Sequence, residues 1–504
     1  MHIGFLNPQG NFDPNNSHIA KHPDFGGQLV YVKQVAIAMA QEGHRVDILT
    51  RRIVDPEWPE FSEFKDVYPG VENLRILRLP AGPEAFVRKE LLWPHLVRDW
   101  VPSILKFYRE EGTLPDAFTT HYSDGGLAGV LIEEQTGIPF TFTAHSLGAQ
   151  KMDKLEVTPE NIKELDDYYS FRYRIIAERL SMNRSAVNIT STQQERFEQY
   201  GHRAYQGAVE PSNDTRFSII PPGVNPKIFG ADVRASDEAD IHKLVQEKLV
   251  RDIDESRREL PAIVASSRLA PKKNVAGLVE AFAKSESLQE QANFVLITSA
   301  LDNPFREQAD DEATEKVLAP IREMVQDQNL WGKISAFSIP SQAALAATYR
   351  FLAKRRSVFA LTSHFEPFGL APLEAVVAGL PVIVTQNSGL ADDLREGEKD
   401  YAILVDPAEP TDMARGLEEL VSNPQRWEEL LNNAQQHVLT YYTWEATAKN
   451  YLEIIKQIVA EPSSRRAENL LSIPEYFKEP SDKDISLEQL QHLYFEAPQA
   501  REKE

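Results

Sequence analysis

Residues 357–385 read SVFALTSHFEPFGLAPLEAVVAGLPVIVT, and this stretch is the best guide to the fold. Apolar runs at 358–361 and 382–384 predict two strands, and the pattern from 371 to 379 predicts a helix that ends at Gly379. The stretch is therefore a strand–turn–helix–strand unit of the kind found in open α/β sheets. Ligands of such sheets bind at the carboxyl ends of the strands.

Two carboxylates of this unit, Glu366 in the turn and Glu374 inside the helix, lie eight residues apart. At about 3.6 residues per helical turn, both can face one site beyond the first strand. On spacing alone, a solvated turn residue is the better interpretation of Glu366. However, Gly369 at the helix start leaves backbone N–H groups open to an anion, and the apolar neighbours of Glu374 indicate that it has a ligand or a partner.

The chain before residue 220 alternates strand-like and helix-like segments. Strands are predicted at 3–6, 46–50, 74–79, 117–120, 139–143 and 186–190. Helices are predicted at 28–42, 126–134 and 161–180, the last with Thr158 as its N-cap and Pro159 at its first position. Strands separated by helices predict a parallel, doubly wound sheet.

Residues 219–223, IIPPG, interrupt this alternation and predict a domain boundary, which a charged helical segment at 237–258 follows. A second sheet of the same type is predicted from strands at 262–266, 294–298, 333–337, 358–361, 382–384 and 402–405. A further helix is predicted near 443–459. The polar tail 461–504 is expected to pack on the surface or to be partly mobile.

The composition excludes several classes of protein. With 504 residues, 42% of them hydrophobic and 26% charged, the chain is predicted to form two or three globular domains. It has no cysteine, which excludes disulfides and thiolate metal sites. A net charge of -22 argues against nucleic-acid binding. The beginning of the chain has no signal-peptide pattern and no run of apolar residues would span a membrane, so we expect a cytoplasmic protein without membrane partners.

Two further segments carry residues suited to a phosphorylated ligand. HPDFGGQ at 22–28 places Gly26 and Gly27 at a helix start, where the helix dipole favours an anion, although an ordinary helix N-terminus has the same pattern. ASSRLAPKKN at 265–274 places Arg268 and Lys273 beyond a strand, where both suit a diphosphate. A solvated basic loop is the alternative for this second segment.

These segments together resemble the retaining GT-B glycosyltransferases, in the family that contains the sucrose synthases and sucrose-phosphate synthases. The resemblance covers nearly the whole chain through FLNPQGNF, HPDFGGQLVYVK, ELLWPHL, TTHYSDGGLAGVL, FTAHSLGAQK, IIAERL, IIPPGVN, SSRLAPKKN and EPFGLAPLEA. It implies two Rossmann-like doubly wound domains facing each other across a central cleft. Residues 1–220 plus about 443–504 would bind the acceptor, and residues 221–442 would bind a nucleotide sugar.

The resemblance also implies roles for individual residues at the donor. Arg268 and Lys273 would neutralise the diphosphate, Glu366 would face hydroxyls of the transferred glucose, and Glu374 would hold the ribose. His145 would contact the glucosyl unit, although a core histidine satisfied locally is the alternative. The remaining donor-binding residues would be Gly27, Gln28, Phe368, Gly369 and Leu370.

The acceptor is expected to be fructose 6-phosphate, whose dianion would be bound by Lys89, Lys151, Arg172 and Arg174. Each of these cations taken alone is more often a surface residue. A sucrose synthase, which uses unphosphorylated fructose, would not need the cluster. It remains an alternative, together with a related transferase that acts on another sugar phosphate.

The reaction expected from the resemblance is glucose transfer from UDP-glucose with retention, driven by fixed cations at the leaving diphosphate. It needs no protein nucleophile, and we expect no cofactor and no metal. Asp252 and Asp254 could pass for a metal-binding pair, but a solvated charged helix is the better interpretation. Ala270 and the segment 387–390 depart from the usual family pattern beside the donor site, which bears on donor preference. A nucleotide-sugar-binding regulatory protein is the alternative outside the enzymes.

Overall fold

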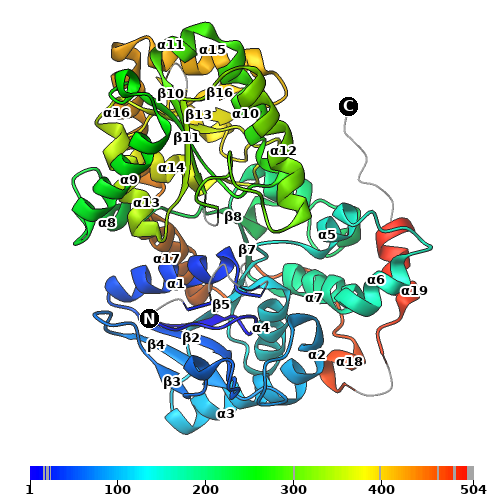
Figure 1. Ribbon diagram of the computed structural model, residues 1–504. Coiled ribbons are helices and arrows are strands. Elements are labelled where there is room, and N and C mark those ends of the chain that lie inside the picture. Colours follow the sequence, from blue (N-terminus) through cyan, green and yellow to red (C-terminus); the bar gives the residue numbers. More distant parts are fainter. Residues whose placement is uncertain are drawn as a thin grey trace. The chain divides into compact units, whose positions relative to one another are not determined.

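The computed structural model describes residues 1–14, 17–18, 22, 24–298, 301–396, 399–462, 465–480 and 484–496. Pro23 of the predicted glycine segment and the last part of the predicted tail, 497–504, lie outside the described residues. The chain divides into two compact units, Met1–Pro221 with Thr447–Glu504, and Pro222–Ala446. The backbone therefore passes between the units twice (Figure 1).

The first unit is built on an eight-stranded sheet of order β3-β4-β2-β1-β5-β6-β7-β8. Its strands are β1 (His2–Leu6), β2 (Arg45–Arg51), β3 (Lys65–Asp66), β4 (Leu74–Leu79), β5 (Ala117–His121), β6 (Phe140–Thr143), β7 (Val187–Thr190) and β8 (Phe217–Ile219). All neighbours pair in parallel except β3, which runs antiparallel to β4. The register sets Ile3 opposite Val46 on one side of β1 and opposite Ala117 on the other.

Helices connect these strands, and the C-terminal part of the chain adds further helices to the same unit (Figure 1). They are α1 (Gly27–Gln41), α2 (Trp93–His95), α3 (Val101–Glu111), α4 (Tyr122–Thr136), α5 (Gly148–Lys154), α6 (Ile162–Tyr169), α7 (Phe171–Arg184), α18 (Glu475–Lys478) and α19 (Leu487–Gln491). Short turns of 3-10 or π-helix are η1 (Pro59–Phe61), η2 (Lys89–Leu91), η3 (Leu96–Trp100), η4 (Glu195–Gln199), η5 (Arg203–Tyr205), η6 (Asp214–Arg216) and η10 (His492–Glu496).

The second unit has a parallel six-stranded sheet of order β11-β10-β9-β12-β13-β16. The strands are β9 (Ala262–Ser266), β10 (Asn293–Thr298), β11 (Ile334–Ser338), β12 (Val358–Leu361), β13 (Val382–Thr385) and β16 (Ile403–Val405), beside an antiparallel pair β14 (Arg395–Glu396) and β15 (Lys399–Asp400). The helices are α8 (Pro226–Phe229), α9 (Glu238–Asp252), α10 (Val275–Lys284), α11 (Glu286–Gln291), α12 (Glu312–Asp327), α13 (Gln342–Ala353), α14 (Leu370–Val377), α15 (Pro410–Val421) and α16 (Pro424–Tyr441), with the short η7 (Glu255–Arg257), η8 (Pro271–Lys273) and η9 (Asp392–Leu394). Helix α17 (Trp444–Ala460) leads out of this unit.

Both faces of the second sheet are buried, as its strand sequences require. Val264 belongs to a core formed with α9, α13, α14 and α16, whereas its neighbour Ile263 belongs to a core formed with α10, α12 and α15. Successive strand residues point to opposite faces. A parallel strand covered on both faces therefore reads as a continuous apolar run.

The predicted helix at 161–180 is wrong in detail, because the structure has two helices there. Ser170, with a φ of 55°, separates α6 from α7. The Asp166 carboxylate accepts a hydrogen bond from the backbone N–H of Arg172 at 2.7 Å and so caps the first turn of α7. The first of the two helices begins at Ile162 after Asn161, not at Pro159. Side-chain bonds to nearby backbone compete with helix continuation in this way.

The described tail packs on the first unit (Figure 1). Phe477, Leu490 and Tyr494 are buried there. The Tyr476 ring stacks on Tyr173 of α7, and the Tyr494 hydroxyl donates to Asp153 of α5 at 2.5 Å. The tail therefore contacts two of the helices that carry the predicted acceptor residues.

The sheets of both units are parallel and doubly wound, apart from β3, as the sequence predicted. Strands β3 and β8 were missed, because each is short. The charged segment is solvated at Arg251, Asp254 and Glu255, as the sequence predicted. The Asp252 carboxylate differs: it is 6% exposed, pairs with Arg251 and accepts from Ser335 Oγ at 2.7 Å. Over the described ranges, no helix has the length and apolarity that would span a membrane.

Candidate active site

In the second unit, neighbouring strands bring two predicted segments together. Strand β9 pairs with β12, so the loop after Ser266 and the turn after Leu361 meet at the carboxyl edge of the sheet. Lys273 Nζ lies 2.5 Å from Glu366 Oε2, and both side chains are less than a fifth exposed. One ion pair thus joins the residue that was predicted to bind the diphosphate to the residue that was predicted to bind the sugar.

The turn that carries Glu366 is held by its backbone. The Glu366 N–H donates to the carbonyl of Asn387 at 3.1 Å, and the Glu366 carbonyl accepts from the N–H of Gly389 at 3.0 Å. Ser388 Oγ adds a bond of 2.9 Å to the carbonyl of Phe368. The segment 387–390, which departs from the family pattern, therefore positions this turn.

Gly369 precedes α14 with a φ of 94°, a conformation that side chains disfavour. A Cβ at this position would lie 3.0 Å from Cγ of Glu366. The helix end has no side-chain cap. Among the described residues no side chain accepts from its first N–H groups, at Leu370 and beyond, and their binding of an anion stays a prediction.

Glu374 projects from α14 into surroundings that favour its neutral form. Burial raises the pKa of its carboxyl to about 7, against the hydrogen bond that Gln342 Nε2 donates to it at 3.2 Å. A half-buried carboxyl that is bonded to Gln342 is suited to accept further hydrogen bonds from ligand hydroxyls.

Arg268 differs from Lys273 because it is exposed. Within the described part of the chain, its guanidinium makes no ion pair and no side-chain hydrogen bond. It is therefore available to an anionic ligand at this edge.

In the first unit, His145 stands just beyond β6 with a φ of 56°. Burial lowers the pKa of its imidazole to about 3, so the ring is neutral at physiological pH. The ring packs edge-on against Tyr31 and stacks on His121. The ring thus has local partners, and it lies at the carboxyl edge of the sheet; its contact with a glucosyl unit stays a prediction.

A hydrogen bond joins the two histidines. His121 Nδ1 lies 2.9 Å from His145 Nε2, so one of these two nitrogens carries the shared proton. His121 Nε2 lies 3.3 Å from Thr119 Oγ1, which also accepts from Thr141 Oγ1 at 3.0 Å. Sequence reasoning missed His121, although it directly follows a predicted strand.

Gly27 and Gln28 begin α1 in the first unit. Gly26, at the N-cap, provides no side-chain hydrogen bond. A Cβ at Gly26 or Gly27 would meet open space. Gln28 Nε2 is buried without a partner among the described residues. This helix start keeps unpaired donors, as an anion-binding segment requires.

Three of the four predicted acceptor cations line one pocket. Its lining comprises Lys89, Glu90, Trp93, Tyr122, Ser123, Asp124, Lys151, Tyr169 and Arg174. Arg172, the fourth predicted cation, is not among them. Its guanidinium is turned to Asp166, with Nε 2.5 Å from Oδ2, and also lies near Asp484 of the tail. In a helix, residues two positions apart point in different directions.

Each cation of the pocket is held differently. Lys89 Nζ pairs with Asp24 at 2.8 Å. The Arg174 guanidinium donates to Glu178 at 2.8 Å and to the Ser146 carbonyl at 2.9 Å. Lys151 has no ion pair within the described ranges, and its ammonium lies 3.8 Å from the centroid of the Tyr169 ring. Burial, together with Arg174 and Lys89, lowers the pKa of Lys151 to about 8. A bound dianion would relieve this repulsion.

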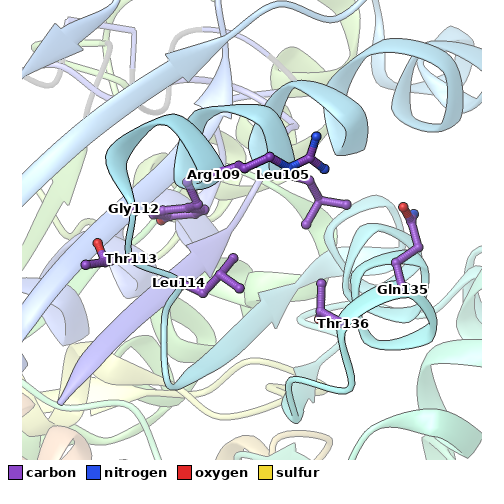
Figure 2. A pocket seen from close by; sticks show the side chains of 8 residues that line it. Leu105, Arg109, Gly112, Thr113, Leu114, Gln135 and Thr136 are labelled. Atoms are coloured by element: carbon purple, nitrogen blue, oxygen red, sulfur yellow. The ribbon is translucent and has the colours of Figure 1, made fainter.

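A larger pocket of about 360 Å³ lies elsewhere in the first unit (Figure 2). It is formed by the last turns of α3 and α4, including Arg109 and Gln135, and by the segment Gly112–Leu114 that leads to β5. It therefore lies at the amino-terminal edge of the sheet, and no predicted site residue lines it.

The described residues contain no cluster of three or more histidines, aspartates or glutamates arranged to hold a metal ion.

The comparisons with known proteins agree with this architecture. Residues 26–204 match a family model described as a glycosyl transferase 4-like domain, and residues 247–437 match one described as glycosyl transferases group 1. A probable sucrose-phosphate synthase of Thermosipho melanesiensis is 40% identical over 478 residues, which are 95% of this chain and 99% of that protein. The chain spans about half the length of the plant sucrose-phosphate synthases that it matches.

Two solved structures are similar over most of the chain. The sucrose-phosphate synthase of Thermosynechococcus elongatus has a TM-score of 0.62 at 22% identity, covering 91% of this chain and 99% of its own. Anabaena HepE, solved in complex with UDP, has a TM-score of 0.59 at 16% identity, covering 91% and 100%. At these identities the likeness shows the fold.

Proposed function

Because the chain belongs to the sucrose-phosphate synthase family of GT-B glycosyltransferases, we propose that it transfers glucose from UDP-glucose to fructose 6-phosphate with retention. The products are sucrose 6-phosphate and UDP. Family membership supports the transfer reaction, and the identity of the two substrates rests on the side chains of the two units.

The pocket of Lys89, Lys151 and Arg174 is the observation that carries the acceptor assignment. A protein of net charge -22 repels anions in general, so a cluster of buried and half-buried cations indicates a specific anionic ligand. A phosphate dianion gains charge-assisted hydrogen bonds there. Unphosphorylated fructose would leave the charges without a ligand.

The second unit supplies the donor residues in the proposal. Arg268 and Lys273 bind the diphosphate, assisted by the N–H groups of Gly369 and Leu370 beside Phe368. A diphosphate that attracts Lys273 leaves the Glu366 carboxylate available to glucose hydroxyls. Glu374 accepts hydrogen bonds from the ribose.

The first unit supplies the remaining donor contacts of the proposal. Gly27 and Gln28 offer hydrogen bonds to the diphosphate. His145, whose ring is neutral, contacts the glucosyl unit.

The chemistry follows from the charges. As the bond from the anomeric carbon to the diphosphate oxygen breaks, its electron pair goes to UDP, and fixed cations stabilise that charge. The fructose hydroxyl oxygen forms the new bond on the same face of the sugar. Its proton passes to an oxygen of the leaving phosphate, so neither glutamate acts as a base. Because Arg268 and Lys273 supply the positive charge, the proposal requires no further cofactor.

Release of UDP in the presence of different acceptors tests the proposal. We expect release from UDP-glucose with fructose 6-phosphate and little with fructose or without acceptor. Release with fructose would instead identify a sucrose synthase activity, and release with a different sugar phosphate would change the acceptor. No release with any acceptor would overturn the proposed reaction and favour a binding protein.

A further inference from the structure

Three polar atoms without partners line the pocket of Lys89, Lys151 and Arg174. They are Trp93 Nε1, Ser123 Oγ and Asp124 Oδ2, each buried and without a hydrogen bond among the described residues. Their side chains belong to residues at most 4% exposed. Buried polar groups normally have partners. The pocket has a volume of about 20 Å³, and its three unpartnered atoms leave hydrogen-bonding positions that a water molecule or a phosphate oxygen would fill.

The fold holds Asp124 in place. Tyr122, with a φ of 67°, turns the chain from β5 into α4. The first turn of α4 packs so tightly that a Cβ at Gly125 would lie 2.3 Å from the Leu6 carbonyl oxygen. Asp124 Oδ1 accepts from the N–H of Gly125 at 2.8 Å, which leaves Oδ2 for the pocket. The backbone of Asp124 is thereby held beside the pocket.

An ionised carboxylate in this position would oppose a phosphate dianion. Burial raises the pKa of Asp124 to about 7, despite the Gly125 N–H and the Lys89 charge, which lower it. The other ionisable groups that face it across the pocket are Asp24, Glu90, Tyr122, Lys151, Tyr169 and Arg174. A dianion would add to the effect of Asp24 and favour the protonated acid further.

We propose that Asp124 binds the acceptor phosphate as a protonated acid, with Oδ2 donating a hydrogen bond to a phosphate oxygen. Ser123 Oγ and Trp93 Nε1 donate beside it. Binding of the phosphorylated acceptor therefore takes up a proton. This inference rests on the proposed acceptor site, and it adds a residue that selects for a phosphate over a hydroxyl group and links its affinity to pH.

Calorimetric titration with fructose 6-phosphate at pH 7.5, in two buffers with different ionisation heats, measures this proton uptake. For a carboxyl with a pKa of about 7, we expect the full chain to take up about 0.8 proton more per bound molecule than Asp124→Asn. Lys151 also contributes protons, since its pKa is about 8, so the difference between the two proteins isolates Asp124. Glu90→Gln is the matched control, because this pocket carboxylate is paired with Arg88. It should keep the uptake.

A second readout is the pH dependence of affinity. Above pH 7 the unbound Asp124 loses its proton, so the dissociation constant of the natural chain should rise by roughly tenfold or more by pH 8.5. The constant of Asp124→Asn should rise much less, since an amide donates at any pH. If that variant does not fold, Ser123→Ala should weaken binding at every pH without changing the uptake.

The outcomes separate this inference from the proposed function. Binding of fructose 6-phosphate with equal proton uptake in the natural chain and Asp124→Asn would overturn the role of Asp124 while leaving the acceptor assignment intact. No binding by the natural chain would overturn both. Equal uptake with unphosphorylated fructose would also contradict the proposal, because the proton would then not depend on the phosphate.

Discussion

At the residue scale, Lys273 and Glu366 hold each other in position before a ligand arrives. Their ion pair at 2.5 Å is partly buried, and Ser363 Oγ also donates to Glu366 at 3.3 Å. A diphosphate would compete with Glu366 for the lysine. Before a ligand binds, each of the two groups therefore neutralises the other, so that neither charge is left unpaired in a half-buried site.

Replacing Lys273 tests this role. Lys273→Ala should lower turnover by roughly 100-fold or more with the fold intact, because stabilisation of the leaving group is lost. Circular dichroism and initial-rate kinetics measure both effects. The neighbouring exposed Lys272→Ala is the control and should remain near the natural rate. A near-normal rate in Lys273→Ala would contradict the assignment.

Lys151 and Arg172 give a matched pair for the acceptor site. Lys151→Ala should raise the KM for fructose 6-phosphate by roughly 10–100-fold, the loss of a charged hydrogen bond, with little change for UDP-glucose. Arg172→Ala should have a much smaller effect, because Arg172 lies outside the pocket and pairs with Asp166. Equal effects of the two substitutions would remove Lys151 from the phosphate site.

His121 is expected to act through His145. In His121→Phe the ring stack is kept but the hydrogen bond to His145 Nε2 is lost, so nitrogen NMR should show a changed balance between the two tautomers of His145. Turnover should fall by roughly fivefold, the cost of about one hydrogen bond. Tyr31→Phe, which keeps its ring against His145, is the control. An unchanged tautomer of His145 in His121→Phe would contradict the proposed action of His121 through His145.

At the scale of elements, α5 and α7 are held from both sides. Glu178 of α7 accepts hydrogen bonds from the first N–H of α5, at Gly148, and from Arg174. From the other side, Tyr494 of the tail donates to Asp153 of α5. The helices that carry Lys151 and Arg174 are thus fixed to each other and to the end of the chain.

Phe477 tests how much the tail contributes. Its side chain is fully buried, so Phe477→Ala should lower the free energy of unfolding by about 3–5 kcal/mol. Thermal unfolding should show a midpoint lower by roughly 10 °C. Leu470→Ala, at an exposed position of the same tail, should change the midpoint little. Equal midpoints for both variants would show that the tail is not part of the core.

At the scale of the whole molecule, each unit closes its own core around its own sheet. The amino-terminal edge of the first sheet is held by a buried network in which Asp47, which is fully buried, contacts His2, Arg75 and Tyr108. Burial raises the pKa of Asp47, but hydrogen bonds from His2 and Arg75 outweigh it and lower the pKa to about 2.

The lowered pKa of Asp47 predicts that the folded protein loses stability as the pH falls. Since the pKa of Asp47 is lower in the folded than in the unfolded chain, its stabilisation is present above about pH 4 and is lost as the pH falls toward 2. The contribution is about 2 kcal/mol. Denaturant unfolding between pH 6 and pH 2 should show a smaller loss of stability in Asp47→Asn. The same loss in both proteins would contradict this role.

Much of the fold was predictable because periodicity and chain order are local properties. The strands at 262–266 and 358–361 were predicted with their observed bounds, since continuous apolar runs predict strands buried on both faces. The strand at 74–79 was also predicted with its observed bounds, although Arg75 and Arg78 interrupt its apolar residues. The break at Ser170 was not, because it depends on a hydrogen bond from Arg172 to one carboxylate.

The candidate site, too, was predictable only in part. By itself the sequence determined the GT-B fold, the family, and which charged residues stand beyond the strands, since these depend on order along the chain. Only the tertiary structure decided that Lys273 pairs with Glu366, that Arg172 faces away from the pocket, and that Asp124 faces into it with Ser123 and Trp93. Side-chain direction and burial depend on elements far apart in the sequence, and the charge of a buried group depends on all of them.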